Sequence, residues 1–139
     1  MPAIATLSSE PISLDAHLVA VADASHGAVA IFVGLVRDHD PAVKGTVTHL
    51  EYSAHPDAET ALVAIVEAVE AQSHTVIALT HRTGLLAVGE PAIIAAAAAT
   101  HRAEAFAACR LVVERVKAEL PIWKREILAD GAHSWVGIA

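Results

Sequence analysis

The sequence predicts an α+β fold, formed by one domain over residues 1–139. Hydrophobic residues make up 55% of the chain and charged residues 18%, which supplies enough apolar material for one sizeable core. Strand-like and helix-like segments follow one another without the strict alternation of a parallel βαβ fold. The clearest helical pattern lies late in the chain, between two groups of expected strands.

The first half of the chain is expected to form three strands and two helices. Ser13 suits the N-cap of the first helix, and the second helix is amphipathic, with Leu62, Ile65, Val66 and Val69 on one face. The apolar, β-branched run GAVAIFVGLVR is typical of a strand buried on both faces. In chain order the segments are a strand and turn at 3–11, a helix at 13–24, a strand at 27–37, a polar loop at 38–45, a strand at 46–52 and a helix at 56–72.

The second half contains the segment that is hardest to assign. The run AIIAAAAAT at 92–100 is mostly alanine, which favours a helix, yet a strand followed by a helix from Thr100 also fits. The pattern HRAEAFAACRLVVERVKAEL at 101–120 predicts a helix that Pro121 ends. The other expected segments are a strand at 74–82, a loop at 83–91 and two closing strands at 122–128 and 133–138.

The charge distribution favours a small anionic ligand. The formal net charge is -7, which argues against general nucleic-acid binding. Seven of the nine Lys and Arg residues nevertheless lie from Arg82 onward, so an acidic chain carries a local basic cluster. A cluster of that kind suits a small anion better than a polyanion.

The single cysteine limits the covalent chemistry of the chain. Cys109 alone excludes an intramolecular disulfide and a cysteine-rich metal site, and it is compatible with a reducing cytoplasm. Nine histidines are present, but none has the H-x-H or H-E-x-x-H spacing of a metal site, so no metal is expected. The sequence shows neither a signal-peptide pattern nor an apolar run long enough for a membrane span, which favours a cytoplasmic protein without membrane contact. Cys109 and Trp123 are both interpreted as core residues.

Arg102 occupies an unusual place at the start of the last expected helix. Helical spacing of 100° per residue puts it within an apolar arc that includes Phe106 and Cys109. A guanidinium directed toward the packed side is costly unless it is paired. Two interpretations follow: a buried ion pair with a carboxylate such as Glu51, or an anion site in which Arg102 and His101 act with the free N–H groups of the helix N-terminus.

A second group of cations comes from the far end of the same helix and from two expected strands. Lys117 lies near the end of the last helix, and Lys124 and Arg125 follow on a strand, where they face opposite sides. A chain that turns back after the helix brings Lys124 close to Lys117. Arg37 ends an apolar strand, a position that commonly opens into a site. The alternative for each lysine alone is a solvated surface charge.

Several motifs together resemble one known family. They occur in order from about Gly27 to Gly137, which is nearly the whole chain, and they read GAVAIFVGLVRDHD, LEY, HRTGLLAVGE, THRAEAFAACR, VKAELPIWKRE and WVG. In this combination they are similar to the large, catalytic subunit of molybdopterin synthase. The resemblance implies an α+β fold of the α/β hammerhead type, with a mainly antiparallel sheet and packed helices. It also implies that 92–99 is a strand ending at His101 and Arg102.

The same resemblance implies a sulfurtransferase of molybdenum cofactor biosynthesis that needs no cofactor of its own. Its substrate is cyclic pyranopterin monophosphate (precursor Z), in which it builds the dithiolene of molybdopterin. The sulfur arrives as a thiocarboxylate at the C-terminal Gly-Gly of a small ubiquitin-like partner subunit. The family assembles as a heterotetramer around a homodimer of the large subunit. The functional positions carried over are Arg37, His101, Arg102, Lys117 and Lys124, with Lys117 as proton carrier or nucleophile and Lys124 assisting.

The spacing along the last helix adds an expectation about assembly. Arg102 and Lys117 are fifteen residues apart, which at about 1.5 Å per residue places them more than 20 Å apart. One small substrate can hardly touch both in one subunit, so the site is expected to be shared across the dimer. The alternative function is a non-catalytic dimeric domain that binds a small anion or pterin without turnover.

Overall fold

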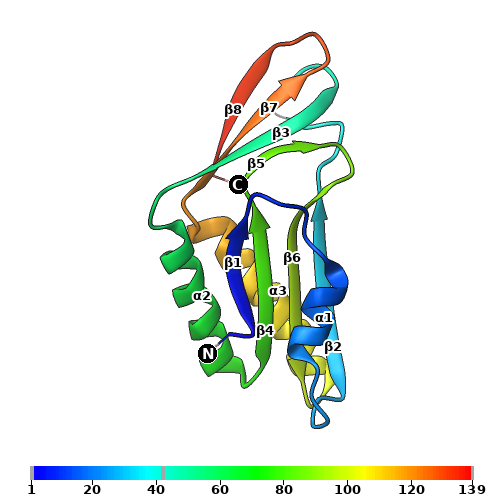
Figure 1. Cartoon of the computed structure of the whole chain (residues 1–139), viewed down its shortest axis with the longest axis vertical. Coiled ribbons are helices and arrows are strands. Elements are labelled where there is room, and N and C mark those ends of the chain that lie inside the picture. The colour runs from blue at the N-terminus through cyan, green and yellow to red at the C-terminus, as the bar shows by residue number, and fades with distance from the viewer. Residues whose placement is uncertain (1, 42, 139) are drawn as a thin grey trace.

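The computed structural model describes residues 2–41 and 43–138, and within them the chain forms three helices and two four-stranded sheets (Figure 1). The first sheet has the strand order β1-β4-β6-β2 and the second the order β5-β3-β7-β8. Every strand pair is antiparallel except β1 with β4. The elements are β1 (Ile4–Ser8), α1 (Leu14–Val21), β2 (Ala28–Leu35), β3 (Val47–Ala54), α2 (Ala58–Ser73), β4 (Val76–Arg82), β5 (Gly84–Ala87), β6 (Pro91–Ala99), α3 (Arg102–Glu119), β7 (Ile122–Leu128) and β8 (His133–Ile138). The α+β prediction is confirmed.

The first sheet is covered by helices on both faces. Helices α2 and α3 contact each other and pack on one face, whereas α1 packs on β4 and β6 from the other. Alternate residues of the central strands separate accordingly: Ile77 and Leu79 belong to the main core, and Ala78 packs with Val21 of α1. Ser13 caps α1 as predicted, because its hydroxyl accepts the N–H of Ala16.

The alanine-rich segment at 92–99 lies within strand β6. The family resemblance implied a strand here, whereas local propensity favoured a helix. Strand β6 pairs with β4 on one side and β2 on the other, so its backbone groups are satisfied within the sheet. Its residues from Ala95 to Ala99 are at most 2% exposed. Small side chains at this position let the helices approach both faces closely, and this tertiary packing outweighs the preference of alanine for helix.

Strand β2 differs from its prediction, because only one of its faces is buried. It forms an edge of the first sheet, and α1 does not extend over it. Val29, Ile31, Val33 and Leu35 are consequently 36–59% exposed. The continuous apolar run therefore marks one core face and one uncovered face.

The second sheet stands at the end of the first toward which β1, β2 and β4 run (Figure 1). One of its strands, β5, was not predicted: it lies in the segment 83–91, which was expected to be a loop. Gly84 and Gly89 have φ angles of 88° and 92°, which bend the chain on either side of this short strand. In the same sheet Trp123 is 38% exposed, so its interpretation as a core residue is wrong. It lies on the outward face of β7 with Arg125.

No helix among the described residues has the length and apolar character needed to cross a membrane.

Candidate active site

A cavity of about 220 Å³ lies between the two sheets and is open to the surface. Both sheets, the loop after β2 and the end of α3 contribute to its wall. The residues that line it are Gly34, Leu35, Arg37, His39, Asp40, Leu50, Tyr52, His81, Ala92, Ile93, Lys117, Lys124 and Glu126. Polar groups thus come from five separate elements to one small space, which is the usual character of a ligand site.

Three cations meet in this cavity. Arg37 comes from the loop after β2, Lys117 from the last turn of α3 and Lys124 from β7. The Nζ atom of Lys124 lies 4.0 Å from Oδ2 of Asp40. Burial and the neighbouring charge of Lys124 lower the pKa of Lys117, which makes it a readier proton donor and nucleophile than a free lysine.

A carboxylic acid with an unusual proton affinity lies beside the cations. Glu126 follows Lys124 by two residues on β7 and shares its face, and it is only 2% exposed. Burial, a hydrogen bond to Asp40 and the charge of Asp40 raise the pKa of Glu126 to about 7. Its Oε2 atom is buried and has no hydrogen-bond partner within the described part of the chain. Glu126 and Asp40 together can therefore hold or release a proton near neutral pH.

The opposite wall carries a neutral histidine. The Nδ1 of His81 donates to the carbonyl oxygen of Arg82 at 2.8 Å, which leaves Nε2 as the unprotonated nitrogen. Burial above all lowers the pKa of His81 to about 4. The ring of Tyr52 meets that of His81 edge-on, with centroids 5.0 Å apart. Burial, with the charge of Glu126, raises the pKa of Tyr52 to about 12, so its phenol stays protonated.

The structure brings together three of the five predicted site residues and leaves two apart. Arg37, Lys117 and Lys124 line the cavity, whereas His101 and Arg102 lie at the opposite end of α3, outside its lining. His101 is the N-cap residue of α3, and both side chains are exposed.

The interpretation of Arg102 as a buried ion pair is wrong. Its expected partner Glu51 instead forms an ion pair with Arg125, whose Nη2 lies 2.6 Å from Oε1. Helix side chains lean toward the N-terminus, so Arg102 in the first turn extends past the end of the sheet at the Ala28–Ala99 pair. Phe106 is also outside the core, with 66% of its surface exposed. Cys109 is buried, as predicted.

Sequence reasoning missed the acidic and neutral groups of the cavity. Asp40, Tyr52, His81 and Glu126 line it, and none was selected from the sequence. Strand alternation could have found Glu126, because a residue two positions from a site lysine on a strand shares its face. Asp40 and His81 are brought in by the packing of one sheet against the other, which no local pattern reports.

No three His, Cys, Asp or Glu side chains among the described residues gather closely enough to hold a metal ion.

Comparison with known proteins identifies the family. The family model described as MoaE protein matches residues 7–119. The chain belongs to the MoaE family. It is 43% identical over 133 residues to the molybdopterin synthase catalytic subunit 1 of Mycobacterium tuberculosis, covering 94% of this chain and 88% of that protein. Its activity is accordingly that of a molybdopterin synthase catalytic subunit, an enzyme that transfers sulfur in molybdopterin synthesis.

Solved structures agree with this assignment. Molybdopterin synthase from Staphylococcus aureus superposes with a TM-score of 0.87 at 31% identity, covering 99% of this chain and 98% of that one. A complex of subunits 1 and 2 of molybdopterin-converting factor from Helicobacter pylori gives a TM-score of 0.66 at 19% identity, covering 81% and 73%, which shows a shared fold. The alternative of a non-catalytic pterin-binding domain is not favoured, because the relatives are catalytic subunits and both lysines line the cavity.

Proposed function

We propose that the cavity between the sheets is where the thiocarboxylate tail of a small ubiquitin-like partner meets precursor Z. The convergence of Arg37, Lys117 and Lys124 on one cavity is the observation that carries this proposal. Both reactants are anions, so they repel each other in water. Clustered cations hold them at reacting distance and stabilise the negative charge that develops during transfer.

The sulfur comes from the partner, since the single cysteine of this chain is buried and the pKa of its thiol is raised by that burial. The thiocarboxylate sulfur forms a bond to a side-chain carbon of the pterin while a C–O bond at that carbon breaks, and the departing oxygen takes up a proton. The sulfur then joins the pterin to the tail as a thioester. Water cleaves the acyl C–S bond, which returns the tail as a carboxylate and leaves the sulfur on the pterin. Two such transfers complete the dithiolene.

Proton transfer is assigned to the groups with altered pKa values. Lys117 carries the proton or holds the acyl group transiently, because its lowered pKa makes the neutral amine more accessible. Lys124 assists it from β7. The pair of Glu126 and Asp40 stores a proton beside Lys124, because the pKa of Glu126 is about 7.

His101 and Arg102 act from the second subunit of a homodimer in this proposal. Arg102 and Lys117 lie at opposite ends of α3, about 22 Å apart along the helix axis. The uncovered face of β2 and the exposed Phe106 supply apolar surface for a dimer contact. An apolar hollow of about 330 Å³ between β2 and α3 adjoins the cavity, because Lys117 lines both.

With two partner subunits the assembly is a heterotetramer, and residues 1–139 act as one functional domain. We place it in the cytoplasm, for which the free cysteine gives support. Neither nucleic acid nor membrane takes part.

The variant Lys117→Ala tests the assignment in a reconstituted reaction with thiocarboxylated partner and precursor Z. Loss of a positioned acid–base group lowers the rate by roughly 10²–10⁴-fold. Lys44→Ala is the matched control, because Lys44 is exposed and lies outside the cavity lining. A folded Lys117→Ala protein with full activity would remove Lys117 from the mechanism.

A further inference from the structure

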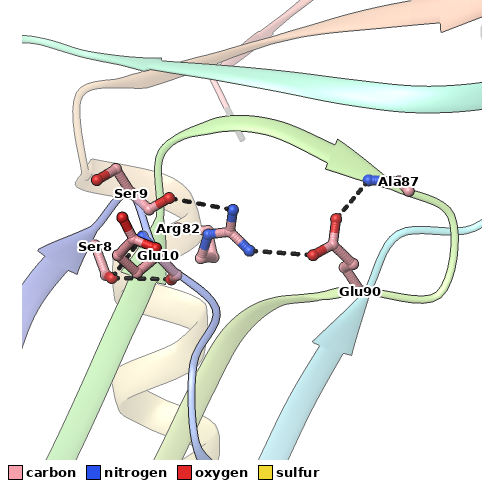
Figure 2. Close-up of polar contacts among 6 residues, drawn as sticks. All are labelled: Ser8, Ser9, Glu10, Arg82, Ala87 and Glu90. Carbon is pink, nitrogen blue, oxygen red and sulfur yellow. Dashed lines mark hydrogen bonds and ion pairs between the residues drawn. The ribbon is translucent and has the colours of Figure 1, made fainter.

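Arg82 is a buried cation outside the cavity lining. It ends β4 with a relative exposure of 5%, directly after the cavity residue His81. Figure 2 shows its guanidinium between the carbonyl oxygen of Ser9 and the carboxylate of Glu90. Nη2 donates to Ser9 at 3.4 Å, and Nη1 lies 3.5 Å from Oε1 of Glu90. Burying a guanidinium costs desolvation free energy, so a buried Arg suggests a role for its contacts beyond stability.

Glu90 connects this cation to a tight turn. Its Oε2 accepts the N–H of Ala87 at 2.7 Å, while its own N–H donates to the carbonyl of Ala87 at 3.1 Å (Figure 2 shows the first of these bonds). Gly89 within this turn has a φ of 92°, which a side chain would strain. The backbone bond to Ala87, ahead of the charge of Arg82, lowers the pKa of Glu90, so the carboxylate is ionised at neutral pH.

The turn at residues 87–90 also holds the backbone that leads to Arg37. The N–H of Val36 donates to the carbonyl of Glu90 at 3.0 Å, and the N–H of Gly89 donates to the carbonyl of Val36 at 2.8 Å. Val36 is 2% exposed and lies one residue before Arg37. Strand β2 has already ended at Leu35, after an irregularity at Gly34, so these two bonds fix the chain beyond the sheet.

We propose that Arg82 is a positioning residue, which acts through Glu90 and the turn at residues 87–90 to hold Arg37 in the cavity. This inference rests on the proposed role of Arg37 in binding the anionic substrate. The ion pair fixes the carboxylate, the carboxylate fixes the turn, and the turn fixes Val36 from both of its backbone groups. A shift of the chain at Val36 would move the guanidinium of Arg37 away from the substrate anion.

Kinetics of three variants test the connection. Glu90→Gln and Arg82→Met should raise the KM for precursor Z on the order of tenfold, the cost of one impaired hydrogen bond to a charged group. kcat should change little, because the lost contact is with the bound anion and not with the reacting atoms. Arg82→Lys should restore part of the affinity. Arg115→Met is the control, since it breaks the exposed Arg115–Glu119 ion pair on α3, and its KM should equal that of wild type.

A double-variant cycle separates positioning from general destabilisation. In the background Arg37→Ala, the further change Arg82→Met should alter KM less than twofold, because its effect passes through Arg37. An undiminished tenfold effect in that background, or an unchanged KM in both Glu90→Gln and Arg82→Met, would overturn the proposal. Glu90→Gln keeps the question open to test even if Arg82→Met does not fold, since Glu90 is partly exposed.

Amide hydrogen exchange tests the same contacts without any substrate. In Glu90→Gln the N–H groups of Ala87, Val36 and Gly89 should exchange faster, while that of Ala95 in the central strand should not. Equal protection of the three amides in both proteins would contradict the proposal that Glu90 holds the turn. If wild type forms no molybdopterin, the proposed function fails, and this exchange experiment still decides whether Arg82 and Glu90 hold the turn.

Discussion

Subunit mixing tests whether each site is built from two chains. The perturbation is a pair of inactive homodimers, Arg102→Ala and Lys117→Ala, which are mixed and allowed to exchange subunits. Their residues lie at opposite ends of α3, about 22 Å apart along the axis. In a mixed dimer one site receives both intact residues and the other receives neither. Random exchange makes about half of the dimers mixed, so activity should return to roughly a quarter of the wild-type value.

The assay is molybdopterin formation from precursor Z and thiocarboxylated partner before and after exchange. Exchange itself is followed with mass-labelled subunits, so that a lack of mixing is recognised. The controls are the two unmixed proteins and a mixture that is assayed before its subunits have had time to exchange. If exchange is complete and no activity returns, the site is not shared between subunits, and Arg102 and Lys117 act within one chain.

Four further outcomes follow from single positions. Arg102→Ala should leave the melting temperature nearly unchanged and weaken precursor Z binding, because its side chain is exposed; calorimetry and binding titration measure both. Lowering the pH from 6.5 to 4 should reduce the free energy of unfolding by about 3 kcal/mol, because His81 has a pKa of 6.5 in the unfolded chain and about 4 in the folded one, so the unfolded chain takes up the proton first. Urea titrations should show a smaller loss in His81→Phe. Glu126→Gln should remove an ionisation near pH 7 from the profile of kcat/KM, since the pKa of Glu126 is about 7. Gly27→Ala should destabilise the fold in a thermal melt, because its Cβ would lie 2.5 Å from the carbonyl oxygen of Thr100.

The order of helices and strands could be predicted from the sequence where local patterns agree with tertiary packing. Helix α2 buries Leu62, Ile65, Val66 and Val69, which are the four residues of its predicted apolar face. Strand β6 is the contrary case, because its alanines favour a helix and only the pairing with β2 and β4 makes it a strand. The family resemblance resolved it. Strand β5 was missed because four residues between two glycines carry little pattern.

The cations of the site could be predicted, whereas their surroundings could not. Lys117 and Lys124 are brought together by the chain reversal that follows α3, and a sequence pattern shows that reversal. The partners Asp40 and His81 come from distant segments that meet only when the second sheet packs on the first. Helical spacing also misplaced Arg102, because the angle around a helix does not tell where the neighbouring sheet ends.

Reconstitution of the wild-type reaction shows directly whether the chain moves sulfur from the partner to precursor Z. The protein is combined with precursor Z and with a partner whose C-terminal Gly-Gly ends either in a thiocarboxylate or in a carboxylate, and molybdopterin and spent partner are quantified by mass spectrometry. We expect product only with the thiocarboxylate partner, with two thiocarboxylates consumed for each dithiolene formed. Absence of molybdopterin from the thiocarboxylate reaction, or its formation with the carboxylate partner, would contradict sulfur transfer at this cavity.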